Sequence, residues 1–153
     1  MPDEYRAFLE AKAALSTGSG FEPSWLPPFL FGFQRALVDW ATRQGRAAIF
    51  ADCGTGKTPM QLTWAENVVR HTNGRVLLLT PLAVGAQTIR EGDKFGIACR
   101  RVLGDKAGIV IANYERLHHF DAADFSGVVC DESSILKSFG GVRRAAITEF
   151  MRR

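Results

Sequence analysis

Short apolar runs alternate along the chain with stretches in which apolar residues recur at helical spacing. Apolar runs of this length predict buried strands, and the helical spacing predicts amphipathic helices between them. The predicted strands are 46–51, 75–80, 99–103, 108–114 and 127–132. The predicted helices are 4–15, 33–43, 57–71, 84–94, 115–120 and 140–153.

The alternation of strand and helix predicts an α/β fold. Strands that are apolar almost throughout are typical of a parallel sheet covered on both faces, because each face must then be buried. We therefore expect a three-layer domain over residues 29–153. Residues 1–28 are expected to form a short N-terminal helix and a linker, since the segment 16–28 is rich in glycine, serine and proline.

Composition places the chain among ordinary globular proteins. Its 153 residues suffice for one domain with a core. No apolar run approaches the roughly 20 residues that span a bilayer, and no secretory signal is recognisable, so we expect a cytoplasmic protein of a bacterial or phage-infected cell without membrane contact. Three widely separated cysteines, at 53, 99 and 130, do not suggest a disulfide framework. The net charge of +3 is compatible with nucleic-acid binding but does not require it.

A glycine-rich turn follows the first predicted strand and precedes a predicted helix. In the sequence DCGTGKT, Gly54 and Gly56 allow backbone N–H groups to approach phosphate oxygens. Lys57 can reach the β and γ phosphates, and the Thr58 hydroxyl can bind Mg²⁺. A turn with a lysine by chance is the alternative, but the strand before it and the helix after it favour a nucleotide phosphate loop. ATP and Mg²⁺ are the expected cofactors.

An acidic pair follows the last predicted strand, in the sequence GVVCDESS. An acid at the carboxyl end of a parallel strand lies at the sheet edge where such folds bind ligands. Asp131 would order the Mg²⁺ shell and Glu132 would polarise the attacking water. The alternative is a solvated pair that caps a following helix.

These motifs, in this order and spacing, resemble the first RecA-like lobe of superfamily-two helicases, and most closely the Swi/Snf-like translocases of phages. The resemblance covers about residues 29–140 and rests on Phe33-Gln34, the loop A-x-x-G-x-G-K-T beginning at Ala51, LLLTPLAVGAQ, and VVCDESS. It implies a P-loop NTPase fold of RecA type that couples ATP hydrolysis to movement along nucleic acid, with DNA favoured over RNA.

The resemblance also implies roles for individual residues. Gln34 corresponds to the glutamine that contacts adenine. Lys57, Asp131 and Glu132 correspond to catalytic residues, and Thr58 and Asp131 to those that hold Mg²⁺. The residues expected to bind ATP are Gln34, Cys53, Gly54, Thr55, Gly56, Lys57, Thr58 and Asp131. Those expected to contact nucleic acid are Thr80, Pro81, Leu82, Gly85, Gln87, Asn113 and Tyr114.

The sequence departs from the family pattern at two points. Ser133-Ser134 replace the residues that usually follow the acidic pair. No motif III and no second lobe with an arginine finger follow, so the chain is expected to be a truncated lobe that binds nucleotide weakly and hydrolyses it very slowly without a second lobe, in cis or in trans. A non-catalytic nucleotide-binding or interaction module that needs a partner is the main alternative. A small-molecule kinase is less favoured, because it would not explain Gln34 or TPLAVGAQ.

Overall fold

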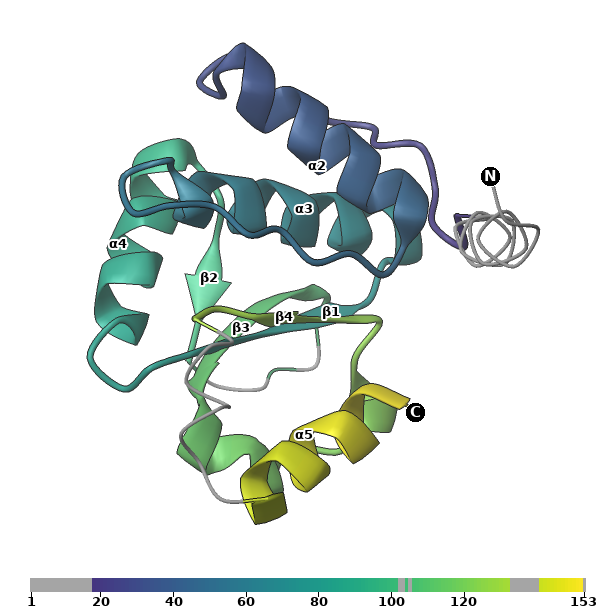
Figure 1. Cartoon of the computed structure of the whole chain (residues 1–153), viewed down its shortest axis with the longest axis vertical. Coiled ribbons are helices and arrows are strands. Elements are labelled where there is room, and N and C mark those ends of the chain that lie inside the picture. Colours follow the sequence, from purple (N-terminus) through teal and green to yellow (C-terminus); the bar gives the residue numbers. More distant parts are fainter. Residues whose placement is uncertain (1–17, 102–103, 105, 133–140, 153) are drawn as a thin grey trace, which may run out of the picture.

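A computed structural model describes residues 18–101, 104, 106–132 and 141–152. Four parallel strands form one sheet in the order β2-β3-β1-β4, which are Cys99–Arg100, Gly108–Asn113, Arg75–Thr80 and Gly127–Cys130. The helices are α2 (Gly32–Gln44), α3 (Lys57–Thr72), α4 (Gly85–Phe95) and α5 (Gly141–Arg152), with short 3-10 helices η1 (Tyr114–His119) and η2 (Ala122–Asp124). The predicted α/β fold with a parallel sheet is confirmed (Figure 1).

Side chains that alternate along the strands divide the core between the two faces of the sheet. Leu78 and Ile109 pack with Leu62 and Val68 of α3 on one face. On the other face, Leu77 and Val110 pack with η1 and α5. Figure 1 shows α3 and α4 on one side of the strands and α5 on the other. Because β1 and β3 are covered on both faces, their central residues are almost completely buried.

The strand predicted at 46–51 is wrong. These residues have no strand partner and run as irregular chain between α2 and the glycine turn. Phe50 is 94% exposed, although it belongs to an apolar run. An apolar run becomes a strand only where a neighbouring strand accepts its backbone hydrogen bonds, and no described strand lies beside this one.

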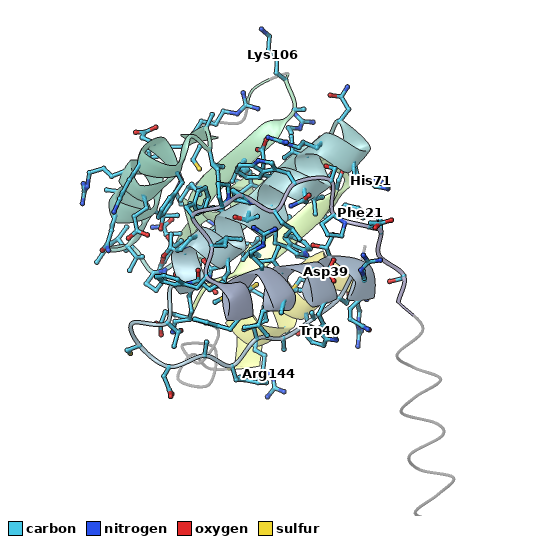
Figure 2. The ribbon with its side chains drawn as sticks, turned by 90° about the horizontal axis from the view of Figure 1, so that it is seen from above. Phe21, Asp39, Trp40, His71, Lys106 and Arg144 are labelled. Carbon is cyan, nitrogen blue, oxygen red and sulfur yellow. The ribbon has the colours of Figure 1, made fainter. Side chains whose placement is uncertain are left out.

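The predicted linker is packed against the domain along its described part, 18–28. The buried side chain of Asn67 in α3 accepts a hydrogen bond from the N–H of Trp25 at 3.0 Å and donates to the Trp25 carbonyl at 2.8 Å. The ring of Phe21 stacks on His71 with centroids 3.9 Å apart (Figure 2). Residues 4–15, predicted as a helix, lie outside the described residues.

Candidate functional site

The carboxyl ends of three neighbouring strands bring polar residues to one edge of the sheet. Thr80 ends β1, Asn113 ends β3, and Asp131 directly follows β4. The order β3-β1-β4 places these residues side by side. In open parallel sheets this edge is where ligands bind, because loops and helix N-termini also converge there. It is the candidate functional site.

The glycine turn before α3 leaves backbone N–H groups free of side-chain caps. Gly56 is the N-cap of α3 with φ 77° and ψ 48°, and no side chain caps the helix. Gly54 also has positive φ, at 80°. The first N–H groups of a helix have no partner within it, and the helix dipole adds positive potential, so this end of α3 suits an anion. This geometry is compatible with the predicted phosphate loop, and phosphate binding by the turn stays a prediction.

Gln34 of α2 holds this turn in place. Its side chain is buried, its Nε2 donates to the Thr55 carbonyl at 2.9 Å, and its Oε1 accepts from the N–H of Phe31 at 2.9 Å. A Cβ on Gly56 would lie 2.2 Å from Gln34 Nε2. The side chain therefore positions the glycine turn, whereas its contact with adenine stays a prediction.

The residues predicted around the nucleotide lie close together. Lys57 Nζ, in the first turn of α3, is 3.7 Å from Glu132 Oε1. Thr58, next to it, is half-buried, and Cys53 is exposed in the turn. The Thr55 hydroxyl donates to the Asp52 carbonyl at 2.7 Å, so it supports the turn. The structure thus joins the glycine turn and the acidic pair into one site.

Glu132 has an unusual backbone conformation. Its φ of 52° is in the left-handed region, which costs a residue other than glycine on the order of 1 kcal/mol. Strained backbone of this kind is frequent at functional sites, where the surrounding structure enforces it. Here the left-handed turn lies beside Lys57, with which the Glu132 carboxylate pairs.

Asp131 is anchored through three different groups. The residue is 7% exposed, and its carboxylate Oδ1 accepts a hydrogen bond from Gln61 Nε2 at 2.8 Å. Its N–H donates to the Leu79 carbonyl at 2.9 Å, and its own carbonyl accepts from the Tyr114 hydroxyl at 2.5 Å. A buried carboxylate with its orientation set in this way can serve as a fixed metal or water ligand.

Gln61 is a site residue that the sequence motifs did not identify. It lies one helical turn after Lys57 on α3, so spacing of four residues along an amphipathic helix is the signal that points to it. Its Oε1 is buried without a hydrogen-bond partner among the described residues. An unpaired buried acceptor beside Asp131 is suited to a bound water.

Tyr114 does not fit the predicted role in nucleic-acid contact. The residue is only 6% exposed, and its hydroxyl donates to the Asp131 carbonyl. Burial raises the pKa of Tyr114 above its ordinary value, and the negative charge of Asp131 adds to the effect. Burial likewise raises the pKa of the Cys130 thiol. Tyr114 therefore remains neutral. Its side chain belongs to the core, and its hydroxyl links η1 to the residue that follows β4.

A small basic pocket lies at the carboxyl ends of β1 and β3, where α4 begins. It encloses about 140 Å³. Two exposed arginines, Arg101 and Arg116, line it, and two buried side-chain oxygens, Thr80 Oγ1 and Asn113 Oδ1, have no hydrogen-bond partner among the described residues. Unpaired polar atoms, positive charge and a helix N-terminus together form a site that suits an anionic group.

Of the other residues predicted to contact nucleic acid, only some line this basic pocket. Leu82 and Gly85 line it. Leu82 is 75% exposed. Pro81 is half-buried in the turn before α4, and the Gln87 side chain points along α4 to Glu91, to which it donates at 3.1 Å. Arg101, within the predicted strand 99–103, and Arg116, shortly after the predicted strand 108–114, were not among the residues predicted to contact nucleic acid.

Comparison with models of protein families gave no match, and comparison with curated proteins gave none either. Among the described residues, no helix has the length and apolar character needed to cross a membrane. What the site can bind is therefore inferred from the chemistry of its own residues.

Proposed function

We propose that the chain is the ATP-binding lobe of a helicase-like, nucleic-acid-dependent ATPase. One observation carries the proposal: the glycine turn at the N-terminus of α3 and the acidic pair after β4 form a single site, with Lys57 Nζ 3.7 Å from Glu132 Oε1. These segments are far apart in sequence, and a phosphate-binding turn facing an acid pair is what ATP hydrolysis with Mg²⁺ requires.

The residues present fit Mg-ATP. The uncapped N–H groups of α3 and Lys57 would hold the β and γ phosphates, and the Thr58 hydroxyl and Asp131 would hold Mg²⁺. The buried Gln61 Oε1 without a partner could accept a hydrogen bond from a water of the metal shell. Glu132 would polarise the attacking water. When nucleotide binds, Lys57 would exchange its ion pair with Glu132 for contacts with the phosphates. The bound metal would neutralise charge on the phosphates.

The RecA-like P-loop fold is part of this proposal. The parallel sheet with β1 at its centre, helices on both faces, and a phosphate loop at the same sheet edge as the acidic pair all support it. The resemblance of the motifs to superfamily-two helicases adds the expectation of a second lobe that completes the nucleotide site.

Nucleic acid would bind at the basic pocket. Arg101 and Arg116 provide positive charge, and Thr80 Oγ1 is a buried group able to donate to a phosphate oxygen. The pocket lies at the same sheet edge as the ATP site, so both ligands would contact loops that follow neighbouring strands. DNA rather than RNA is proposed from the Swi/Snf-like resemblance alone.

Calorimetric titration with Mg-ATP and Mg-ADP tests the nucleotide site. We expect Lys57→Ala to weaken binding at least tenfold, because it removes the charge that faces the phosphates. Lys106→Ala, which removes an exposed lysine elsewhere, is the matched control and should bind as the wild type does. A folded wild-type chain whose affinity for nucleotide is unchanged by Lys57→Ala would refute the proposed phosphate loop.

Fluorescence anisotropy with a labelled DNA duplex and its RNA counterpart tests the basic pocket. Arg116→Ala should weaken binding by several-fold and reduce the dependence of affinity on salt, because one phosphate contact is lost. Arg35→Ala removes an equal charge from an exposed position on α2, outside the pocket, and should have a smaller effect. Equal losses in both variants would mean that charge alone, and not this pocket, attracts nucleic acid.

A further inference from the structure

The basic pocket has a buried floor and a charged rim. The floor consists of residues at the carboxyl ends of β1 and β3: Thr80 is 1% exposed, Ile111 3% and Ala112 8%. Arg101 and Arg116 are exposed and lie at the rim. A ligand must therefore pass two positive charges to reach the ends of the strands.

Gly85, the first residue of α4, leaves the space above this floor open. A Cβ at this position would lie 3.4 Å from Thr80 Oγ1, 3.6 Å from Ile111 Cγ2 and 3.7 Å from Arg101 Nη2. The hydroxyl, the methyl and the guanidinium group therefore converge in front of a bare Cα. Because no side chain projects into this space, a ligand can approach the backbone of α4 there.

The groups around this space can donate hydrogen bonds. Thr80 Oγ1 is buried and has no hydrogen-bond partner among the described residues. No side chain caps the start of α4, so its first N–H groups also lack a partner within the helix. Asn113 Oδ1 is buried without a described partner as well, and rotation of its amide would present Nδ2 instead. A ligand with several acceptor oxygens would satisfy these groups together.

The charge of the basic pocket suits a dianion. Arg101 and Arg116 contribute two positive charges, and none of the described residues that line the pocket is acidic. A phosphodiester within a strand carries one negative charge, whereas a phosphate at the end of a strand carries about −1.5 to −2 at neutral pH. A terminal phosphate has three free oxygens and one ester link, so it can enter with its oxygens first. An internal phosphodiester would bring a sugar on each side to the rim.

We infer that the basic pocket binds the terminal phosphate of a nucleic-acid strand, and that Gly85 admits it. The inference rests on the proposed nucleic-acid site and narrows its ligand from the backbone in general to the end of a strand. Thr80 and the start of α4 would hydrogen-bond the phosphate oxygens at the floor. Arg101 and Arg116 would pair with the same oxygens from the rim.

Competition binding to the full chain, followed by fluorescence anisotropy, tests the inference. The competitors are short single-stranded DNA oligonucleotides of one sequence that carry a 5′-phosphate, a 3′-phosphate or hydroxyls at both ends. We expect a phosphorylated strand to bind about tenfold more tightly than the hydroxyl strand, because its end adds charge-assisted hydrogen bonds. Inorganic phosphate, at the concentration of the strand, should not compete.

Gly85→Ala separates entry into the pocket from attraction by charge. Gly85 has no positive φ and the added methyl group would meet no atom closer than 3.4 Å, so the variant should fold. It keeps both arginines but fills the space in front of α4, so the tenfold advantage of the phosphorylated strand should be lost. Gly32→Ala changes the first residue of α2, where a Cβ meets nothing within 4 Å, and should keep the advantage.

Thr80→Val is a second variant, which serves if Gly85→Ala does not fold. It removes the hydroxyl at the floor at nearly constant shape, so it should reduce the advantage of the phosphorylated strand several-fold. The hydroxyl strand, which does not reach the floor, should bind this variant as it binds the wild type.

The outcomes distinguish this inference from the proposed function. Equal binding of the three strands, weakened by Arg116→Ala, would overturn the inference but leave the nucleic-acid site in place, because internal phosphates would then occupy the pocket. No binding of any strand would contradict both. An advantage that survives both Gly85→Ala and Thr80→Val would place the strand end elsewhere and overturn the inference. Competition by inorganic phosphate as strong as that of the phosphorylated strand would overturn it in favour of a small free anion.

Discussion

Two six-residue segments of this chain have similar sequences and opposite structures. RVLLLT, at 75–80, is β1, and its central leucines are completely buried. RAAIFA, at 46–51, begins with the same residue type and is also apolar, but it forms no strand and exposes Phe50. The segments differ in their neighbours: β1 lies between β3 and β4, whereas 46–51 has no strand on either side among the described residues.

The comparison shows that a strand is a property of a pair of segments. β1 exchanges backbone hydrogen bonds with two strands and is covered by helices on both faces. For 46–51, a groove lined by this segment and by β4 lies between the two. Without a partner, the conformational entropy of fixing the backbone is not offset by hydrogen bonds or burial.

The largest expected difference between the two segments is in the stability lost when a large side chain is replaced by alanine. Leu78→Ala, in the fully buried strand, should lower the free energy of unfolding by about 2–5 kcal/mol, because it leaves a cavity against α3. Ile49→Ala should lower it by about 1 kcal/mol or less, since its side chain is only half-buried. Urea denaturation followed by circular dichroism measures both values.

Equal losses of unfolding free energy in Leu78→Ala and Ile49→Ala would contradict this contrast, because they would show that 46–51 is packed as firmly as β1. Phe50→Ser serves as a control for surface effects. Its side chain has almost no packing to lose, so the stability of this variant should stay close to that of the wild type.

A smaller difference in stability is expected between two variants of the glycine turn into which 46–51 leads. Gly56→Ala combines a positive φ with a Cβ 2.2 Å from Gln34 Nε2, so it should cost about 2–4 kcal/mol through backbone strain and lost hydrogen bonds. Gly54→Ala has a similar φ but no atom within 4 Å of the Cβ, so backbone strain of about 1 kcal/mol is expected. Thermal unfolding of the two variants gives the contrast.

The double variant Gln34→Ala with Gly56→Ala sharpens this result. If Gln34 holds the turn, removing its side chain also removes the clash with a Cβ at position 56. The double variant should then lose less stability than the sum of the losses of the two single variants. Strict additivity would mean that Gln34 does not fix the loop.

The elements predicted from sequence were mostly correct, for a local reason. Apolar periodicity and glycine punctuation lie within each segment, so α3 and β3 are found within a residue or two of their predicted bounds. The acidic pair and the glycine turn were also predicted to share a sheet edge, which the distance between Lys57 and Glu132 bears out as geometry. The mistaken strand at 46–51 has the same cause, because its local pattern is that of a strand.

The interactions that the sequence did not reveal join distant segments. Gln61 meets Asp131 from a separate element, and Tyr114 reaches the Asp131 carbonyl from η1 instead of facing a ligand. Asn67 fixes the segment that composition indicated to be a linker. None of these contacts has a local signature, because each depends on how α3 and η1 pack against the sheet.

The sequence by itself determined the long helices, the central strands and the glycine turn before α3, since periodicity and glycine positions are local properties of the chain. Only the tertiary structure decided which apolar run became a strand and which polar side chains met Asp131. Those outcomes depend on pairing partners distant in sequence, because burial and hydrogen bonding are satisfied between segments and not within them.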